Sequence, residues 1–266
     1  MNNYLLVTTF NKSGYDLYGR KMLNAFLTFW PKDQSIAVYT EDVELDDNLK
    51  NDPRILIKDL LTVTDLVNFK ERHKDNKEAN GYKTDNPAVK NFQFDAVRFS
   101  HKVFAIYDCV CNNPDKSVIW LDADTITHSV VPSNFLETNF PPANYGVSYL
   151  GRIKQYSECG WVVYHMSNPM MKDFWETFVN YYRNDTIFGL KEWHDSYVFD
   201  VVREEYEAKG LINHNITPGF IAGHPFINCV LGEYMDHMKG PRKSVGRSKK
   251  TERNINPEKV IDYWKS

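Results

Sequence analysis

The sequence predicts an α/β fold in which a central, mostly parallel sheet is flanked by helices. The first sixty residues alternate between short apolar runs and a helical stretch, as expected for parallel strands joined by crossover helices. The apolar run from Val118 to Leu121 is short and rich in β-branched residues, which is typical of a buried central strand. The chain has 266 residues, of which 42% are hydrophobic, so it can bury a sizeable core as one elaborated domain or as two small ones.

The first half of the chain is expected to contain three strands and two helices. The strands lie at 4–9, 36–39 and 54–57, where apolar runs are bounded by polar residues. Both helices have apolar faces at spacings of three and four, and Pro31 ends the first. These faces consist of Tyr15, Tyr18, Met22, Phe26 and Phe29, and of Ala96, Phe99, Val103, Ile106 and Val110. Residues 70–86 are strongly polar and are predicted to form an exposed excursion.

The second half continues this alternation. Strands are expected at 117–121, 145–149 and 159–165, helices at 171–182 and 195–206, and a last strand or loop at 219–223. Gly160 precedes an apolar run, where a glycine often lets a ligand approach the backbone. Asp195 or Ser196 is expected to cap the last helix. The chain then ends in a basic tail and an amphipathic patch, which are Arg247, Lys249, Lys250 and Arg253, and Val260, Ile261, Tyr263 and Trp264.

Composition narrows the class of protein. The net charge of −3 gives no general attraction to nucleic acid or to an anionic membrane. Four cysteines are too few and too scattered for a disulfide scaffold. The first apolar run lacks a basic leader and is too short for a signal or a membrane span, so we expect a cytoplasmic protein with no transmembrane segment. Aromatic residues are frequent at 14%, and such side chains fill cores or line grooves for sugars and bases.

Two carboxylates stand at the end of the predicted central strand. Side chains two positions apart on a strand point the same way, so Asp122 and Asp124 would face one spot. Their mutual repulsion is relieved by a cation, and hard oxygen ligands suit Mg²⁺ or Mn²⁺. Ligands of open α/β sheets collect at the carboxyl ends of strands. On the preceding helix, Arg98 and Lys102 could reach a phosphate or a ribose near that end.

Paired aspartates after a strand occur in more than one class of enzyme. A metal-dependent glycosyltransferase using a nucleotide sugar is the first hypothesis. A metal-dependent phosphohydrolase or nucleotidyltransferase is the second, although such enzymes usually place further acids next to the first pair, and 125–129 has none. A non-catalytic binding module with a decayed site is the third.

Three segments in order resemble a known family, the GT-A-type glycosyltransferases of family eight, which includes glycogenin and bacterial lipopolysaccharide galactosyltransferases. The run 118–124 is similar to the family's apolar run into Asp-x-Asp, and 159–164 to its Asn-x-Gly-hydrophobic segment. Residues 237–243, His-Met-Lys-Gly-Pro-Arg-Lys, match His-x-x-Gly-x-x-Lys. The pairing of this last motif with Asp-x-Asp more than a hundred residues upstream makes the resemblance specific.

The resemblance implies a single GT-A, Rossmann-like domain and a set of site residues. Residues 1–232 would form the catalytic domain, and 233–266 a C-terminal segment whose basic tail closes over the active site. Asp122, Asp124 and His237 would hold Mn²⁺ or Mg²⁺. The donor would contact Thr8 and Thr9 at its base, Arg98 and Lys102 at its nucleotide, Gly240 and Lys243 at its diphosphate, and also Ala123 and Lys239 within the motifs. Asp195 lies where the family contacts the sugar and acceptor, so Asp195 and Lys243 are the candidate catalytic residues.

The implied reaction is transfer of a sugar, as by a hexosyltransferase, from a nucleotide sugar, foremost a UDP-sugar. The acceptor could be a glycan, a protein, a lipid-linked sugar or a nucleic-acid base. The resemblance implies retention at the anomeric carbon, whereas inversion would need a base such as Asp195. Residues 237–243 are short and polar, so we expect them to be mobile without ligand and to close over the diphosphate. The chain departs from the family pattern at Glu158 or Cys159, where Asn is usual, at Ser196, where Gln is usual, and at Ser244, where Trp often follows the Lys.

Overall fold

The computed structural model of the chain describes residues 3–83, 89–142, 144–221, 223–240 and 242–252. Some of the expectations above concern other residues. The end of the polar excursion at 84–86, Pro241, Arg253 and the amphipathic patch at 260–264 lie outside the described residues.

Nine strands form two sheets in the described chain. They are Tyr4–Asn11 (β1), Ile36–Glu41 (β2), Ile55–Asp59 (β3), Ser117–Leu121 (β4), Thr125–Thr127 (β5), Tyr145–Arg152 (β6), Gln155–His165 (β7), Ile212–Asn215 (β8) and Met235–His237 (β9). Seven make the central sheet in the order β3-β2-β1-β4-β7-β6-β8, and β5 pairs with β9. Within the central sheet β7 runs antiparallel to β4 and to β6, while the other four pairings are parallel.

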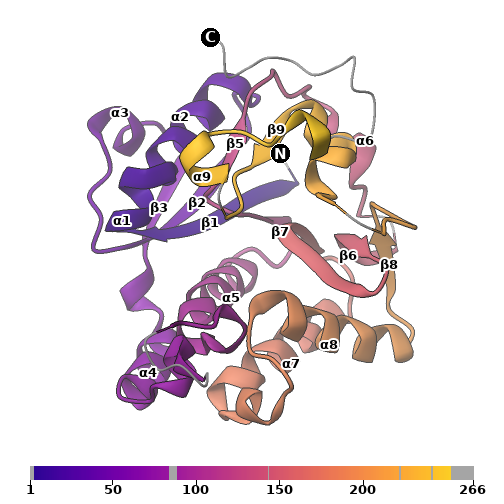
Figure 1. Cartoon of the computed structure of the whole chain (residues 1–266). Helices are drawn as coiled ribbons and strands as arrows, with labels where there is room; N and C mark the ends of the chain where they lie inside the picture. The colour runs from indigo at the N-terminus through magenta and orange to yellow at the C-terminus, as the bar shows by residue number, and fades with distance from the viewer. Residues whose placement is uncertain (1–2, 84–88, 143, 222, 241, 253–266) are drawn as a thin grey trace.

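Helices cover both faces of this sheet (Figure 1). They are Lys12–Gly14 (α1), Arg20–Phe29 (α2), Asp47–Lys50 (α3), Thr64–His73 (α4), Ala96–Cys111 (α5), Phe135–Asn139 (α6), Met171–Arg183 (α7), Asp195–Ala208 (α8) and Arg242–Val245 (α9). In Figure 1, α4, α5, α7 and α8 lie below the sheet, whereas α1, α2, α3, β5 and β9 lie above it.

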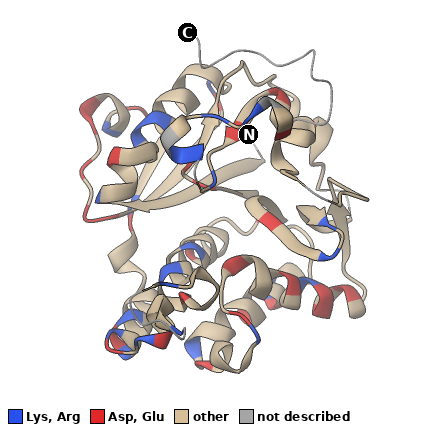
Figure 2. Ribbon diagram, viewed as in Figure 1, with Lys and Arg blue, Asp and Glu red and all other residues tan. Residues whose placement is uncertain are grey.

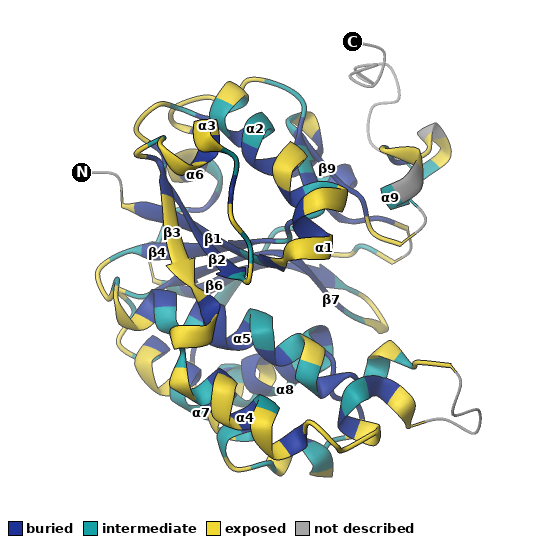
Figure 3. Ribbon diagram, turned by 90° about the vertical axis from the view of Figure 1, so that its left-hand side faces the viewer, coloured by how far each residue is buried: buried dark blue, intermediate teal, exposed yellow. Residues whose placement is uncertain are grey.

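Alternation along the strands divides the buried apolar residues into two cores. On β1, Leu5 and Val7 join the core between the sheet and α4, α5, α7 and α8. Leu6 and Phe10 point to the other face and join the core around α2, α6 and β9. Figure 3 shows buried residues along the sheet and on the inner sides of the helices. Each fully buried large side chain contributes roughly 1.5–3 kcal/mol of transfer free energy, so the sheet forms a rigid base for the loops at its edge.

The predicted fold class, α/β with a mostly parallel central sheet flanked by helices, is confirmed. Several details differ. The short strands β5, β8 and β9 were not predicted, and 219–223 contains no strand among its described residues. The polar excursion is partly helical, because Lys70 to His73 complete α4, whose Phe69 is buried. The cap of α8 is His194, whose Nδ1 accepts a hydrogen bond from the backbone N–H of Tyr197, and not Asp195 or Ser196.

The start of the C-terminal segment is part of this fold. Thr125 to Thr127 pair with Met235 to His237, and the Met238 backbone N–H donates to the Asp124 carbonyl at 2.8 Å. Met235 is 0% exposed and belongs to the core beneath α2. Of residues 237–243, which were expected to be mobile without ligand, His237 and Met238 are therefore buried and paired with the rest of the fold.

Candidate active site

The two aspartates lie in a tight turn between β4 and β5. The Asp122 N–H donates to the Gly160 carbonyl at 3.0 Å, and the Thr125 N–H donates to the Asp122 carbonyl at 2.9 Å. Because β4 ends at Leu121, strand alternation does not align the two side chains as predicted. The turn brings both carboxylates to the same spot instead.

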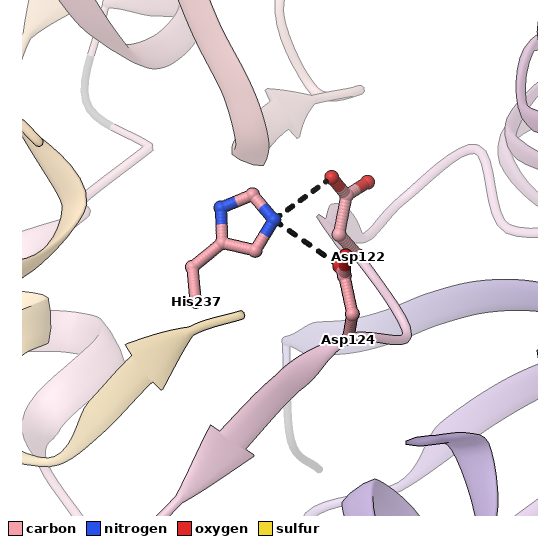
Figure 4. Close-up of side chains that lie close together, drawn as sticks. All are labelled: Asp122, Asp124 and His237. Carbon is pink, nitrogen blue, oxygen red and sulfur yellow. Dashed lines mark hydrogen bonds and ion pairs between the residues drawn. The ribbon is translucent and has the colours of Figure 1, made fainter. Parts of the chain in front are cut away.

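His237 reaches this turn from β9. Its Nε2 lies 3.1 Å from Asp124 Oδ1 and 3.4 Å from Asp122 Oδ2 (Figure 4). One ligand atom from each of the three residues lies within 4.8 Å of the others. The pairing of β9 with β5 thus joins residues more than a hundred positions apart into one cluster of two carboxylates and an imidazole.

A further carboxylate, that of Glu158, lies on the Nδ1 side of the His237 imidazole. Glu158 is 3% exposed, and its Oε1 is 3.5 Å from His237 Nδ1, a buried nitrogen with no hydrogen-bond partner among the described residues. Glu158 Oε2 also accepts from Lys239 Nζ at 3.0 Å. A histidine that ligates a metal usually directs its other nitrogen to a carboxylate, so this arrangement fits a divalent ion held by Asp122, Asp124 and His237.

Gly160 makes room for the imidazole. A Cβ at this position would lie 2.6 Å from His237 Cε1 and Nδ1, which is too close for any real contact. The sequence predicted that this glycine allows a ligand to approach the backbone. In the structure, the group that approaches it is the ring of His237.

Lysine side chains surround the acidic pair. Lys102 Nζ lies 3.2 Å from Asp122 Oδ1 and 2.6 Å from Asp195 Oδ2. Lys243 Nζ lies 2.9 Å from Asp124 Oδ2 and 4.9 Å from the centre of the Tyr18 ring. The site therefore combines acidic groups for a cation with basic groups for an anionic ligand.

Burial and charge act against each other on the pKa values here. Burial alone would lower the pKa of His237, but hydrogen bonds to Asp122 and Asp124 raise it to about 10. Burial would raise the pKa of Asp122, but Lys102 and then His237 hold it far below its usual value. Glu158 behaves in the same way: burial would raise its pKa, but the charge of Lys239 lowers it. Burial would also raise the pKa of Asp124, but its hydrogen bond to His237 lowers it, so Asp122, Asp124 and Glu158 are all anionic at neutral pH.

These groups line a cavity of about 640 Å³ at the carboxyl ends of β1 and β4. Of the residues predicted to form the site, the cavity is lined by Thr9, Arg98, Lys102, Asp122, Ala123, Asp124, Asp195, His237, Lys239, Gly240 and Lys243. Thr8 does not line it, because it lies on the same face of β1 as Leu6 and is fully buried. Its neighbour Thr9 points to the other face and donates to the Tyr39 carbonyl at 2.7 Å.

Sequence reasoning overlooked some residues of this cavity. Glu158 was noted only as a departure from a pattern, although a carboxylate inside an apolar strand is itself a signal of a polar site. Tyr18 was assigned to an apolar helix face and Trp120 to the buried central strand, yet both line the cavity. Trp120 carries Lys102 Nζ 4.7 Å from its ring centre, so it positions that lysine as well as filling the core.

Comparisons with known proteins were made for the whole chain. No family model and no curated protein matches the sequence. Among solved structures, it is similar to mouse xyloside xylosyltransferase 1, with 12% identity, a TM-score of 0.47, and coverage of 79% of this chain and 84% of that one. It is also similar to a glycosyltransferase involved in glycosylation of the major capsid of PBCV-1, with 12% identity, a TM-score of 0.46, and coverage of 91% and 95%. The glycosyltransferase GlyE of Streptococcus pneumoniae follows, with 11% identity, a TM-score of 0.41, and coverage of 76% and 43%. Within the described residues, no helix combines the length and the apolar character that a bilayer crossing requires.

Proposed function

We propose that the protein is a metal-dependent glycosyltransferase that moves a sugar from a nucleotide-sugar donor, foremost a UDP-sugar, to an acceptor with retention of configuration. The observation that carries this proposal is the clustering of Asp122, Asp124 and His237 with Lys243 in one cavity. The resemblance of the same residues to Asp-x-Asp and His-x-x-Gly-x-x-Lys supports it.

Each group has a role in this proposal. Asp122, Asp124 and His237 hold Mn²⁺ or Mg²⁺, which supplies positive charge to the leaving diphosphate when bound. Lys243 donates to the diphosphate oxygens, and Gly240, with φ of +61°, exposes its backbone to them. Asp195, held by Lys102, faces the cavity where the sugar and acceptor would meet.

Charge explains why these groups favour transfer. As the bond from the anomeric carbon to the diphosphate breaks, negative charge grows on the leaving oxygen. Cationic groups that are already in place stabilise that charge at no reorganisation cost. Lys243 contacts Asp124, Lys102 contacts Asp122, and both line the cavity, so both could serve this purpose.

The test is calorimetric titration of the protein with UDP, with Mn²⁺ and after chelation. We expect UDP to bind only with the metal and Asp124→Asn to abolish that binding, while Asp65→Asn, outside the cavity, does not. Unchanged UDP affinity in EDTA would refute the donor assignment.

Incubation with a panel of UDP-sugars separates a glycosyltransferase from a phosphohydrolase. A phosphohydrolase would release phosphate from nucleotides, whereas a transferase releases UDP and free or transferred sugar.

A further inference from the structure

A second cavity adjoins the candidate active site. It has a volume of about 790 Å³ and lies between the β6–β7 hairpin, the first half of α8 and the segment after β8. Cavities of roughly 300–1,000 Å³ hold ligands of the size of a small saccharide. Nothing in the proposed metal and donor site uses it.

Two residues line both cavities, Arg152 and Tyr156. The Tyr156 hydroxyl donates to Glu192 Oε1 at 2.7 Å, and Glu192 itself lines the candidate active site. The two cavities therefore share these two side chains. Tyr197, two residues after Asp195 on α8, also lines the second cavity, so this cavity reaches the helix that carries the candidate catalytic carboxylate.

The acidic groups of the second cavity already have hydrogen-bond or ion-pair partners within the fold. Asp200 accepts from the Ser157 N–H and hydroxyl, at 2.8 and 2.6 Å, and from Arg203 Nε at 3.1 Å. Arg203 also pairs with Glu204 at 2.9 Å and with Glu207 at 2.6 Å. Three carboxylates share the one guanidinium of Arg203, so each has a partner, but the network keeps a net negative charge that nearby basic residues must offset.

Two basic residues of the hairpin, Arg152 and Lys154, form no ion pair within 4.0 Å in the described part of the chain, although the charge of Arg152 also helps to lower the pKa of Glu158. Arg152 Nε donates to the Tyr156 carbonyl at 2.6 Å, which fixes the plane of the guanidinium. Its two terminal nitrogens contact no acceptor among the described residues. A guanidinium presented in this way matches the paired oxygens of a carboxylate or phosphate. Blue segments mark the end of this hairpin in Figure 2.

Tyrosines supply the rest of the lining. Tyr149, Tyr156 and Tyr197 all border the cavity, and the Tyr156 and Tyr197 rings meet edge to face at 5.3 Å. The hydroxyls of Tyr149 and Tyr197 have no hydrogen-bond partner among the described residues. Aromatic faces pack against the C–H faces of sugar rings, and free phenol groups hydrogen bond to their hydroxyls.

We propose that this cavity binds the acceptor, and that the acceptor is a saccharide bearing a carboxylate or phosphate that Arg152 and Lys154 recognise. The proposal rests on the proposed glycosyltransferase function. It adds the chemical class of the second substrate, which the donor site does not define.

The test titrates the full chain, loaded with Mn²⁺ and UDP, with three matched sugars: glucose, glucuronate and glucose 6-phosphate. We expect at least one acidic sugar to bind about tenfold more tightly than glucose, and Arg152→Gln to remove that preference. Arg152→Lys keeps the charge but not the paired N–H donors of the guanidinium, so it should retain part of the preference for the acidic sugar. Lys154→Gln should reduce this preference, and Lys21→Gln, at an exposed and remote position, should not. The two acidic sugars separate a carboxylate site from a phosphate site.

Three results would overturn the proposal: acidic and neutral sugars binding equally, no binding of either acidic sugar, or an unchanged preference in Arg152→Gln. The Mn²⁺–UDP affinity, measured in the same calorimeter, is the independent check. If the Mn²⁺–UDP affinity is intact but the sugars do not bind as expected, only the acceptor proposal is wrong. If UDP itself does not bind, the donor assignment is the one that fails.

Discussion

A carboxylate inside a protein is tolerated only when cations or hydrogen-bond donors surround it, and Glu158 has Lys239 on one oxygen and His237 near the other. Its position behind the imidazole gives it a second task. By accepting from Nδ1, it would keep Nε2 free to face Asp122 and Asp124.

We therefore predict that Glu158→Gln weakens Mn²⁺ binding by roughly 10–100-fold, as measured by electron paramagnetic resonance of the free ion. Glu192→Gln is the matched control, because Glu192 pairs with His194 at 2.9 Å in the same manner but away from the aspartates. Equal losses in the two variants would contradict the assignment. Lys239→Met tests whether Glu158 acts by orienting His237 or by its charge. If Glu158 acts only by its charge, Mn²⁺ should bind more tightly once Lys239 is removed.

Asp195 offers a second prediction at this scale. Since His194 caps α8, the loss of the Asp195 carboxylate should not remove the cap. We expect Asp195→Asn to lower sugar transfer by roughly 10²–10⁴-fold while the Mn²⁺–UDP affinity changes little. Steady-state rates and calorimetry measure the two quantities. Unchanged turnover with a lower melting temperature would show that Asp195 serves only to hold Lys102.

At the scale of elements, β7 and β9 depend on each other through Gly160. The imidazole of His237 occupies the space that any side chain at this position would need. β7 thus shapes the site in two ways: Gly160 leaves space for the imidazole, and Glu158 supplies a carboxylate.

We predict that Gly160→Ala displaces His237, lowers Mn²⁺ affinity by at least tenfold and lowers the melting temperature. The control is Gly189→Ala, because a Cβ at Gly189 meets nothing within 4 Å. Calorimetry and thermal unfolding of both variants check this. If Gly160→Ala binds Mn²⁺ as tightly as Gly189→Ala, the imidazole does not need the space that the glycine provides.

The elements that could be predicted are those with enough residues to carry a pattern. Strands β1, β2 and β4 contain apolar runs, and α5 and α7 have complete apolar faces, so their positions followed from periodicity. β5 and β9 have three residues each, which is too short for any period, and they form because tertiary contacts pair them. The direction of β7 could not be predicted either, because an antiparallel strand buried on both faces has the same composition as a parallel one.

The candidate site was predictable where its residues sit in short motifs. Asp122, Asp124, His237 and Lys243 were found in this way, and the structure places them in one cavity. Glu158 was seen only as a departure from the Asn-x-Gly segment, because its partners Lys239 and His237 are distant in sequence, and Arg152 belongs to no motif. The repulsion assumed between the two aspartates was also incomplete, since Lys102, Lys243 and His237 surround them.

At the scale of the whole molecule, a buried histidine ties the sheet together and makes stability depend on pH. His165 is 0% exposed, and its Nδ1 and Nε2 lie 2.8 Å from Ser117 Oγ and 3.0 Å from Ser148 Oγ, which links β4, β7 and β6. Burial, followed by the charge of His214, lowers its pKa to about 4. The unfolded chain, with a pKa near 6.5, binds more protons between these values, so stability is lost as pH falls from about 6.5 to about 4.

We predict that this residue alone contributes roughly 3 kcal/mol to that loss in unfolding free energy. Urea unfolding at pH 7, 5.5 and 4.5 measures it. His165→Asn should show a shallower dependence on pH over the same range, whatever its absolute stability. The same slope in the variant and the wild type would assign the effect to other groups, of which His224, with its pKa also lowered by burial to about 4, is the first to examine.

The pairing of β9 with β5 also orders events during synthesis. The chain leaves the ribosome N-terminus first, so all seven strands of the central sheet are made before His237. The residues between Asn215 and His237 take about 1–4 seconds to add at 5–20 residues per second. During that interval the nascent chain contains the residues of all seven strands and both aspartates, but not His237. A product that terminates in this region would therefore lack the imidazole of the proposed metal site.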